Sequence, residues 1–370
     1  MSSFQTRQIP ILDLQPEIDA LLPQISEAVE RVIQSTQFIL GPETLAFEEE
    51  VAEWLGAKFA VGVNSGTDAL VIGLRAAGIG TGDEVITAPF SFFASAESIS
   101  NVGARPVFVD VELDSMNIDT TLIEAAITEK TRAIVPVHLF GNPCDMDKVM
   151  ALADKYDLKV IEDCAQSFGS QVSGKYTGTI GHVGAFSFFP TKNLGCYGDG
   201  GLIATDDDKI AEQCRKLRSH GSLKKYQNEI LGYNSRLDAI QAAILRIKLP
   251  YVATYNENRN RIAAAYWEGF KGVHGIAPPQ VVAGHVFHQY TVRVLSGKRN
   301  EVQRKLQDMG IQTMIYYPTP QDRLPVYAGQ FPEFPKSDIL AAEVLSLPIW
   351  PQMDDETQAY VIECVKSALK

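Results

Sequence analysis

The spacing of apolar residues is the first feature that organises this chain. In its first two-thirds, short runs of apolar residues alternate with amphipathic stretches. Most of the runs are continuously apolar, which is typical of strands covered by helices on both faces. The sequence therefore predicts strands at 58–63, 84–88, 106–110, 133–137, 159–163, 185–189 and 201–205.

The amphipathic stretches between these runs have the spacing of helices. They lie at 67–78, 95–104, 120–128 and 145–157. Alternation of strands with helices predicts an α/β fold with one mostly parallel sheet, here of seven strands, and ligands bound at the carboxyl ends of the strands.

The pattern changes after Leu202. Two long helical stretches follow, with Pro250 expected to break the second, and beyond about residue 275 come a strand at 285–295, a helix near 299–309 and a terminal helix from Asp355. We therefore expect a large domain at 1–250, with an N-terminal helical segment, and a smaller α+β domain at 251–370.

Charge and cysteine content exclude several classes of partner. The 370 residues carry a net charge of −12, which disfavours binding to nucleic acid or to an anionic membrane surface. The five cysteines are scattered and odd in number, and we found neither a signal-peptide pattern nor an apolar run long enough to span a bilayer. We therefore expect a cytoplasmic protein. We also expect no metal site, since His285 and His288 would point to opposite faces of their predicted strand.

One lysine stands between an apolar strand and a glycine-rich loop, in the stretch "GAFSFFPTKNLGCYGDGG" at 184–201. Pro190 ends the strand and Lys192 follows at the start of a turn. A lysine held against apolar walls loses hydration, so its pKa falls and it becomes a competent nucleophile. The alternative is a lysine whose ammonium group reaches from a strand end to water.

Two further stretches place polar groups at strand ends. "VGVNSGTDAL", at 61–70, predicts a strand, a turn and a helix whose first amides suit a phosphate, although an ordinary helix cap explains it equally. In "VIEDCAQSFGS", at 160–170, Glu162 and Asp163 close a strand and Gln166 returns to the same edge. A buried carboxylate needs a partner, but it could also be a helix-capping acid.

Taken together, the three stretches predict a pyridoxal 5'-phosphate site. The lysine would form the Schiff base, the helix terminus would bind the phosphate, and the acid would keep the pyridine nitrogen protonated so that the ring absorbs carbanion charge.

The chain also resembles the DegT/DnrJ/EryC1/StrS family of sugar aminotransferases, which have the aspartate-aminotransferase fold (fold type I). The motifs that carry the resemblance occur in the family's order: "ILGPE", "NSGTDAL", "GDEVIT", "EDCAQSFG", "FSFFPTKNLG", "GDGG" and "GYNSRLDAIQAAIL". The resemblance implies that Lys192 is the Schiff-base lysine and proton carrier, and that Asp163 is the partner of the pyridine nitrogen. It places Gln166 at the cofactor ring or its hydroxyl and Phe92 stacked on the ring.

The same resemblance assigns the phosphate site and a second subunit. Gly66, Thr67 and Ser187 match the residues that hold the phosphate, and Asn234 matches an asparagine contributed by the neighbouring subunit. The implied assembly is a homodimer with shared active sites. As an alternative or additional role, Asn234 would cap a helix beginning at Arg236.

The activity implied by the resemblance is transfer of an amino group from L-glutamate, which leaves as 2-oxoglutarate, to a nucleotide-linked keto sugar. Relatives with histidine in place of Lys192 dehydrate sugars, so the lysine favours amino transfer. The chain departs from the family at Tyr316 and Asp322, where histidines are frequent, and Tyr316 is therefore a candidate substrate-binding residue. A packed loop tyrosine is the alternative.

The motif style favours a dTDP- or UDP-linked 3-keto hexose as the acceptor. Amination at C4, another reaction on a cyclic ketone, dehydration and a non-enzymatic regulatory role remain as alternatives. The intact set of Lys192, Asp163 and Ser187 speaks against the regulatory role.

Overall fold

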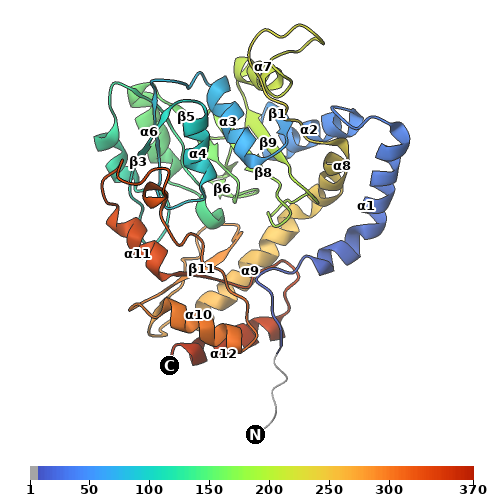
Figure 1. Cartoon of the computed structure of the whole chain (residues 1–370). Helices are drawn as coiled ribbons and strands as arrows, with labels where there is room; N and C mark the ends of the chain where they lie inside the picture. The colour runs from blue at the N-terminus through green and yellow to red at the C-terminus, as the bar shows by residue number, and fades with distance from the viewer. Residues whose placement is uncertain (1–6) are drawn as a thin grey trace.

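The computed structural model describes residues 7–370, and a seven-stranded sheet is its central element (Figure 1). The strand order is β1-β9-β8-β5-β4-β2-β3, and β9 alone runs antiparallel to its neighbours. The strands are β1 (Phe59–Val63), β2 (Glu84–Thr87), β3 (Arg105–Phe108), β4 (Thr131–Ile134), β5 (Lys159–Asp163), β8 (Val183–Ser187) and β9 (Gly201–Thr205). The predicted mostly parallel α/β sheet is confirmed, with the ends of each strand within three residues of their expected positions.

Helices cover both faces of the sheet, which explains why its strands lack polar alternation. On one face pack α3 (Gly66–Ala76), α4 (Ala94–Asn101) and α7 (Asp208–Leu217). On the other face pack α2 (Pro42–Leu55), α6 (Met146–Tyr156) and α8 (Ala239–Lys248). In β8, Val183 and Ala185 face the first group, whereas Phe186 faces α2 and α8. Both sides of the strand are thus buried in apolar layers.

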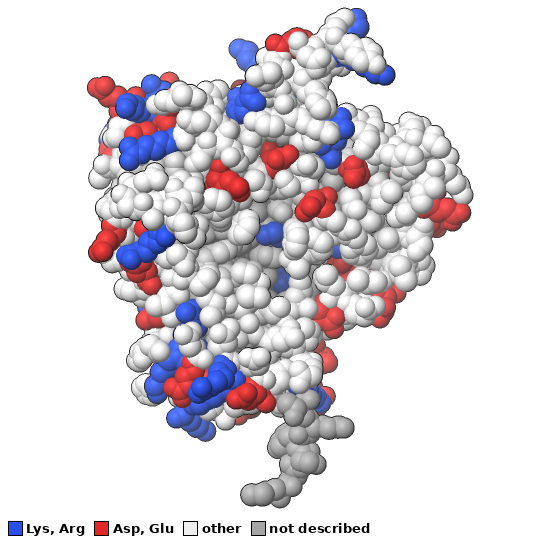
Figure 2. Space-filling model, in the orientation of Figure 1, with Lys and Arg blue, Asp and Glu red and all other residues white. Residues whose placement is uncertain are grey.

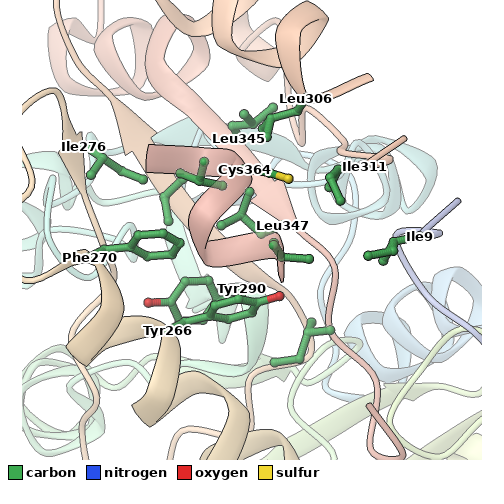
Figure 3. Close-up of a cluster of buried hydrophobic side chains, with 14 of the residues drawn as sticks. Ile9, Tyr266, Phe270, Ile276, Tyr290, Leu306, Ile311, Leu345, Leu347 and Cys364 are labelled. Carbon is green, nitrogen blue, oxygen red and sulfur yellow. The ribbon is translucent and has the colours of Figure 1, made fainter. Parts of the chain in front are cut away.

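The C-terminal part of the chain forms a second apolar core, shown in Figure 3. It is built from a three-stranded antiparallel sheet, β10 (Ile276–Ala277), β11 (Tyr290–Val294) and β12 (Val344–Leu347), and from α9 (Val252–Phe270), α10 (Arg299–Asp308) and α12 (Asp355–Ala368). The buried apolar residues of α11 (Pro335–Glu343), Leu340 and Ala341, instead pack in the core of the large sheet. Tyr266 and Phe270 of α9 pack there with Tyr290. Ile9 joins the same core and pairs with Ile311, so the N-terminal segment returns to the C-terminal part.

The junction between the two parts agrees with the expected effect of Pro250. A 3-10 turn, Leu249–Tyr251, separates α8 from α9, as the proline removes a backbone donor from the helix. The N-terminal helical segment is α1 (Gln15–Ser35) followed by α2. The division into domains 1–250 and 251–370 remains a prediction, because residues at both ends of the chain share the second core.

Two predicted elements are corrected by the structure. The strand expected at 285–295 forms only as β11, so His285 and His288 lie before it and not on it. Phe287 has a φ of 41°, which breaks extended backbone, and both histidine rings hydrogen-bond nearby groups. The helix expected at 120–128 is limited to α5 (Thr120–Ile123) and a 3-10 turn, Glu124–Ala126.

Surface charge of both signs is interspersed on the face seen in Figure 2, where basic and acidic side chains lie beside each other. Within residues 7–370, no helix combines the length and the apolar character required to cross a membrane.

Candidate active site

The candidate site lies at the carboxyl end of β5, where Asp163 is the last residue of the strand. Asp163 is 5% exposed, and its Oδ2 accepts a hydrogen bond of 2.8 Å from the Ser95 hydroxyl of α4. Its Oδ1 accepts the backbone N–H of Ala165 at 3.1 Å. Burial raises the pKa of Asp163, while the hydrogen bonds and the charge of Lys192 act in the opposite direction.

Lys192 follows β8, the strand next to β5, and its backbone N–H donates to the carbonyl oxygen of Phe189 at 2.9 Å. Loss of hydration lowers the pKa of Lys192 to about 8, and the negative charge of Asp163 opposes that shift only in part. Within residues 7–370 no carboxylate forms an ion pair with its ammonium group. A buried lysine whose pKa is lowered to about 8 has a substantial neutral fraction near physiological pH.

A cradle for an anion forms where the start of α3 meets the end of β8. A Cβ added to Gly66 would lie 2.6 Å from Cβ of Ser187, so the two residues adjoin closely. The Ser65 hydroxyl accepts the N–H of Asp68 at 3.1 Å, but no partner for the N–H groups of Gly66 and Thr67 is found in the described part of the chain. These groups lie at the positive end of the helix dipole.

Gln166 is fixed at both ends of its amide. Its Oε1 accepts the backbone N–H of Phe140 at 2.6 Å, and its Nε2 donates to the hydroxyl of Tyr317 at 2.8 Å. The Phe92 ring, which is 58% exposed, lies with its centroid 6.2 Å from that of Tyr317. An exposed aromatic ring beside buried polar groups is suited to stack on a planar ligand.

Neither Asn234 nor Tyr316 takes part in the side-chain hydrogen bonds described above for Asp163 and Gln166. Asn234 is exposed and pairs through its backbone with Ser219. Because α8 begins only at Ala239, the predicted capping of a helix from Arg236 is wrong. Tyr316 is half-buried close to Gln289, and burial raises its pKa.

Several buried residues that support this site were missed by sequence reasoning. Ser91 lies 3.0 Å from Ser95, oxygen to oxygen, and so extends the hydrogen-bond chain that ends at Asp163. Glu162 points away from Asp163, contacts Nε2 of His138 at 3.0 Å and accepts the N–H groups of Gly178, Ile180 and Gly181. Only strand alternation, which sends neighbouring side chains to opposite faces, could have separated the two acids in advance.

The buried group of His138, Glu162 and Cys164 has the ligand types of a metal centre. However, Nδ1 of His138 already accepts the N–H of Cys144, and Nε2 contacts the carboxylate of Glu162. We therefore interpret this group as the support that fixes β5 to the loop at 178–181.

The remaining side chains fit pyridoxal 5'-phosphate. The Gly66 cradle leaves room for a phosphate where any larger residue would collide with Ser187. A buried carboxylate, a lysine with a lowered pKa and an exposed aromatic ring are the other groups that such a cofactor requires.

Comparison with known proteins agrees with this chemistry. Residues 20–366 match the DegT/DnrJ/EryC1/StrS aminotransferase family. A "Pleiotropic regulatory protein" from Geobacillus stearothermophilus is 47% identical, covering 96% of this chain and 97% of the relative. An Acidithiobacillus ferrooxidans protein named UDP-N-acetyl-3-dehydro-alpha-D-glucosamine 3-aminotransferase is 44% identical, covering 99% of both chains. The crystal structure of S. venezuelae DesV in complex with a ketimine intermediate superposes with a TM-score of 0.96, at 42% identity and 99% coverage of both chains.

Proposed function

Because the chain belongs to the DegT/DnrJ/EryC1/StrS aminotransferase family, we propose that it transfers an amino group from L-glutamate to a dTDP- or UDP-linked 3-keto hexose. The enzyme class is that of the family: a pyridoxal-phosphate-dependent sugar aminotransferase. The observation that carries the proposal is the meeting of Lys192, Asp163 and the Gly66–Ser187 cradle at one edge of the sheet.

The bound cofactor supplies an aldehyde that takes up the amino group and a ring that accepts negative charge from the deprotonated carbon. Lys192 would hold the cofactor covalently. Once the amino donor displaces it, its Nζ would carry a proton between the donor carbon and the cofactor carbon. Its lowered pKa supports both tasks, because only the neutral amine attacks a carbonyl or accepts a proton.

Asp163 would hold a proton on the pyridine nitrogen. The Ser95 and Ala165 hydrogen bonds fix the plane of its carboxylate, and burial keeps competing water away from it. An acid whose charge is fixed and shielded from water interacts more strongly with a protonated ring nitrogen than an exposed one does.

The positions of five further residues suggest the remaining contacts with the cofactor. Gly66, Thr67 and Ser187 would bind the phosphate through the start of α3 and one hydroxyl. Phe92 would stack on the cofactor ring, and Gln166 would contact the ring near its hydroxyl group.

The 3-keto acceptor is supported by the name of the Acidithiobacillus ferrooxidans relative, which contains a 3-dehydro sugar and a 3-aminotransferase. Tyr316 would contact the sugar. Amination at C4 is the second candidate. The regulatory name of the Geobacillus stearothermophilus relative is less informative for this chain, because a regulator has no need of the desolvated lysine and the buried acid.

We also propose a cytoplasmic homodimer in which Asn234 reaches the phosphate of the partner's site. Support comes from the exposure of Asn234 and from Tyr226 and Leu231 in the same loop, which are 86% and 85% exposed. Large apolar side chains at such exposure suit a subunit contact. The five cysteines are all buried and unpaired, which agrees with a reducing compartment.

The acceptor is tested with nitrogen-15-labelled L-glutamate and a panel of dTDP- and UDP-linked 3-keto and 4-keto sugars, with mass spectrometry of the products. The proposal predicts label in the 3-amino sugar and little in the 4-amino sugar. Label in the 4-amino sugar alone would assign amination to C4, and no labelled sugar at all would refute the proposed acceptor class. Lys192→Ala is the control for non-enzymatic amination.

A further inference from the structure

A cavity of about 670 Å³ lies outside the candidate active site and is lined by neither Lys192 nor Asp163. It is bounded by the segments that follow β3 and β4, by the hairpin of β6 (Gln171–Val172) and β7 (Lys175–Tyr176), and by the segment 279–291. This volume lies in the range of small-molecule sites.

The lining of this cavity selects against anions. It contains the carboxylates of Glu112, Asp114 and Asp145 and several amides and hydroxyls, but no lysine or arginine. Asp145 forms an ion pair of 2.7 Å with Lys148 of α6, whereas Glu112 and Asp114 form none among residues 7–370. Nucleotides and sugar phosphates carry charges that such a wall repels. A neutral or cationic ligand with many hydroxyl groups would find hydrogen-bond partners there.

His285 provides a buried donor in the wall of the cavity. The residue is 4% exposed, and its Nδ1 accepts the backbone N–H of Phe287 at 2.9 Å. Burial lowers the pKa of His285 to about 3, so the ring is neutral and its proton is on Nε2. For that N–H group we found no hydrogen-bond partner among residues 7–370. The Nε2 atom is not fully enclosed by protein, so its N–H group can donate to a ligand or to water in the cavity.

Three residues in the cavity wall have left-handed backbone conformation. Met116, Phe140 and Ser173 all line it, and all have positive φ angles, of 60°, 58° and 51°. Left-handed backbone at residues other than glycine is unfavourable and is concentrated at functional sites in proteins.

The turn at Phe140 joins this cavity to the candidate active site. Phe140 lines the cavity, while its backbone N–H donates to Oε1 of Gln166, and the other end of that amide binds Tyr317. The Phe140 and Tyr317 rings are nearly parallel, with centroids 6.5 Å apart. A ligand that packs on the turn would therefore restrain Gln166.

We propose that this cavity binds an unphosphorylated amino sugar or a closely similar hydroxyl-rich amine, and that its occupation stabilises the Phe140–Gln166 contact. The carboxylates of Glu112 and Asp114 attract the ammonium group of such a ligand, and the N–H of His285 donates to one of its oxygens. Binding is independent of the proposed amino transfer, whereas the effect on Gln166 rests on the proposed cofactor site.

The experiment is calorimetric titration of the cofactor-loaded enzyme with D-glucosamine and, as the anionic counterpart, with D-glucosamine 6-phosphate. We expect saturable binding of glucosamine and at least about tenfold weaker binding of the phosphate, which corresponds to about 1.4 kcal/mol. Ala283→Phe should fill part of the cavity and weaken glucosamine binding at least about tenfold. Val281→Phe is the matched control, because Val281 is exposed and outside the lining.

Absence of saturable binding, equal binding of the phosphate, or equal effects of the two phenylalanine variants would overturn the site. The coupling is tested separately by hydrogen exchange of the Phe140 amide, which should slow when glucosamine is bound. An unchanged exchange rate despite binding would overturn the coupling. None of these readouts requires a keto sugar or turnover, so failure here and failure of the proposed function are distinguishable.

Discussion

Among single residues, Lys192 owes its proposed reactivity to its surroundings. Loss of hydration lowers its pKa to about 8, whereas an exposed lysine stays protonated far above neutral pH. The neutral amine is the reactive form, and its fraction rises as pH passes through the pKa. Attachment of pyridoxal phosphate to the cofactor-free protein should therefore accelerate with pH and level off not far above pH 8.

The rate of this attachment is measured as growth of the violet absorption band of lysine-bound cofactor, from about pH 6 to about pH 10. Lys192→Ala should give no site-specific band and so corrects for reaction at surface lysines. A rate that keeps rising to the upper end of that range would indicate an ordinary lysine pKa.

The contact between Ser95 and Asp163 predicts a graded loss of activity. Ser95→Ala removes one hydrogen bond to the carboxylate and should lower kcat about tenfold, while Ser95→Thr, which keeps the hydroxyl, should stay near the wild type. Asp163→Ala removes the acid itself and should cost about 100-fold or more with the fold retained. Steady-state kinetics and circular dichroism check the series. Equal kcat for Ser95→Ala and wild type would remove Ser95 as a positioning residue.

The sequence predicts the site residues that lie at or after strand ends, but not the residues that hydrogen-bond to them. Lys192 and Asp163 can be predicted from the sequence because Asp163 ends the apolar strand β5 and Lys192 follows five residues after the apolar strand β8. Ser95 and Tyr317 approach Asp163 and Gln166 from distant parts of the chain. No local pattern fixes such tertiary contacts, so these two residues could be recognised only in three dimensions.

At the scale of elements, the phosphate cradle depends on the close approach of α3 to β8. Gly66→Ala would place a methyl group 2.6 Å from Cβ of Ser187 and push the start of α3 away from the strand. Such overpacking typically costs 1–3 kcal/mol, so cofactor affinity should fall by about tenfold or more. Equilibrium titration with pyridoxal phosphate measures this loss.

Gly80→Ala is the matched control, since its added methyl group would have only the Val102 carbonyl oxygen nearby, at 3.8 Å. Unchanged cofactor affinity in Gly66→Ala would contradict a phosphate site at this helix start.

The elements of the large sheet were predictable because helices bury both faces of the strands, which leaves long apolar runs. The same rule failed at 285–289, where Val286 and Phe287 are also apolar. There the chain turns inward: His288 contacts the Asn193 side chain through Nδ1 at 3.0 Å, and Asn193 donates to Asn256 of α9. Apolar character alone cannot distinguish a strand from such a buried turn.

At the scale of the whole molecule, the proposed homodimer makes a prediction about mixed subunits. If Asn234 completes the partner's site, a dimer of one Lys192→Ala and one Asn234→Ala subunit contains one intact site. Unfolding and refolding an equal mixture should therefore restore about a quarter of wild-type activity at limiting cofactor, because half of the dimers are mixed. Activity no greater than the sum of the separate variants would argue against shared sites.

The most direct test of amino transfer by this protein is its visible absorption spectrum after purification with pyridoxal phosphate, before and after addition of L-glutamate. We expect a violet-region band from lysine-bound cofactor. Glutamate should shift it to the shorter wavelength of the aminated cofactor, and addition of a 3-keto nucleotide sugar should restore it. A band that glutamate leaves unchanged would contradict glutamate as the donor, and no band in the presence of excess cofactor would contradict the pyridoxal phosphate site itself.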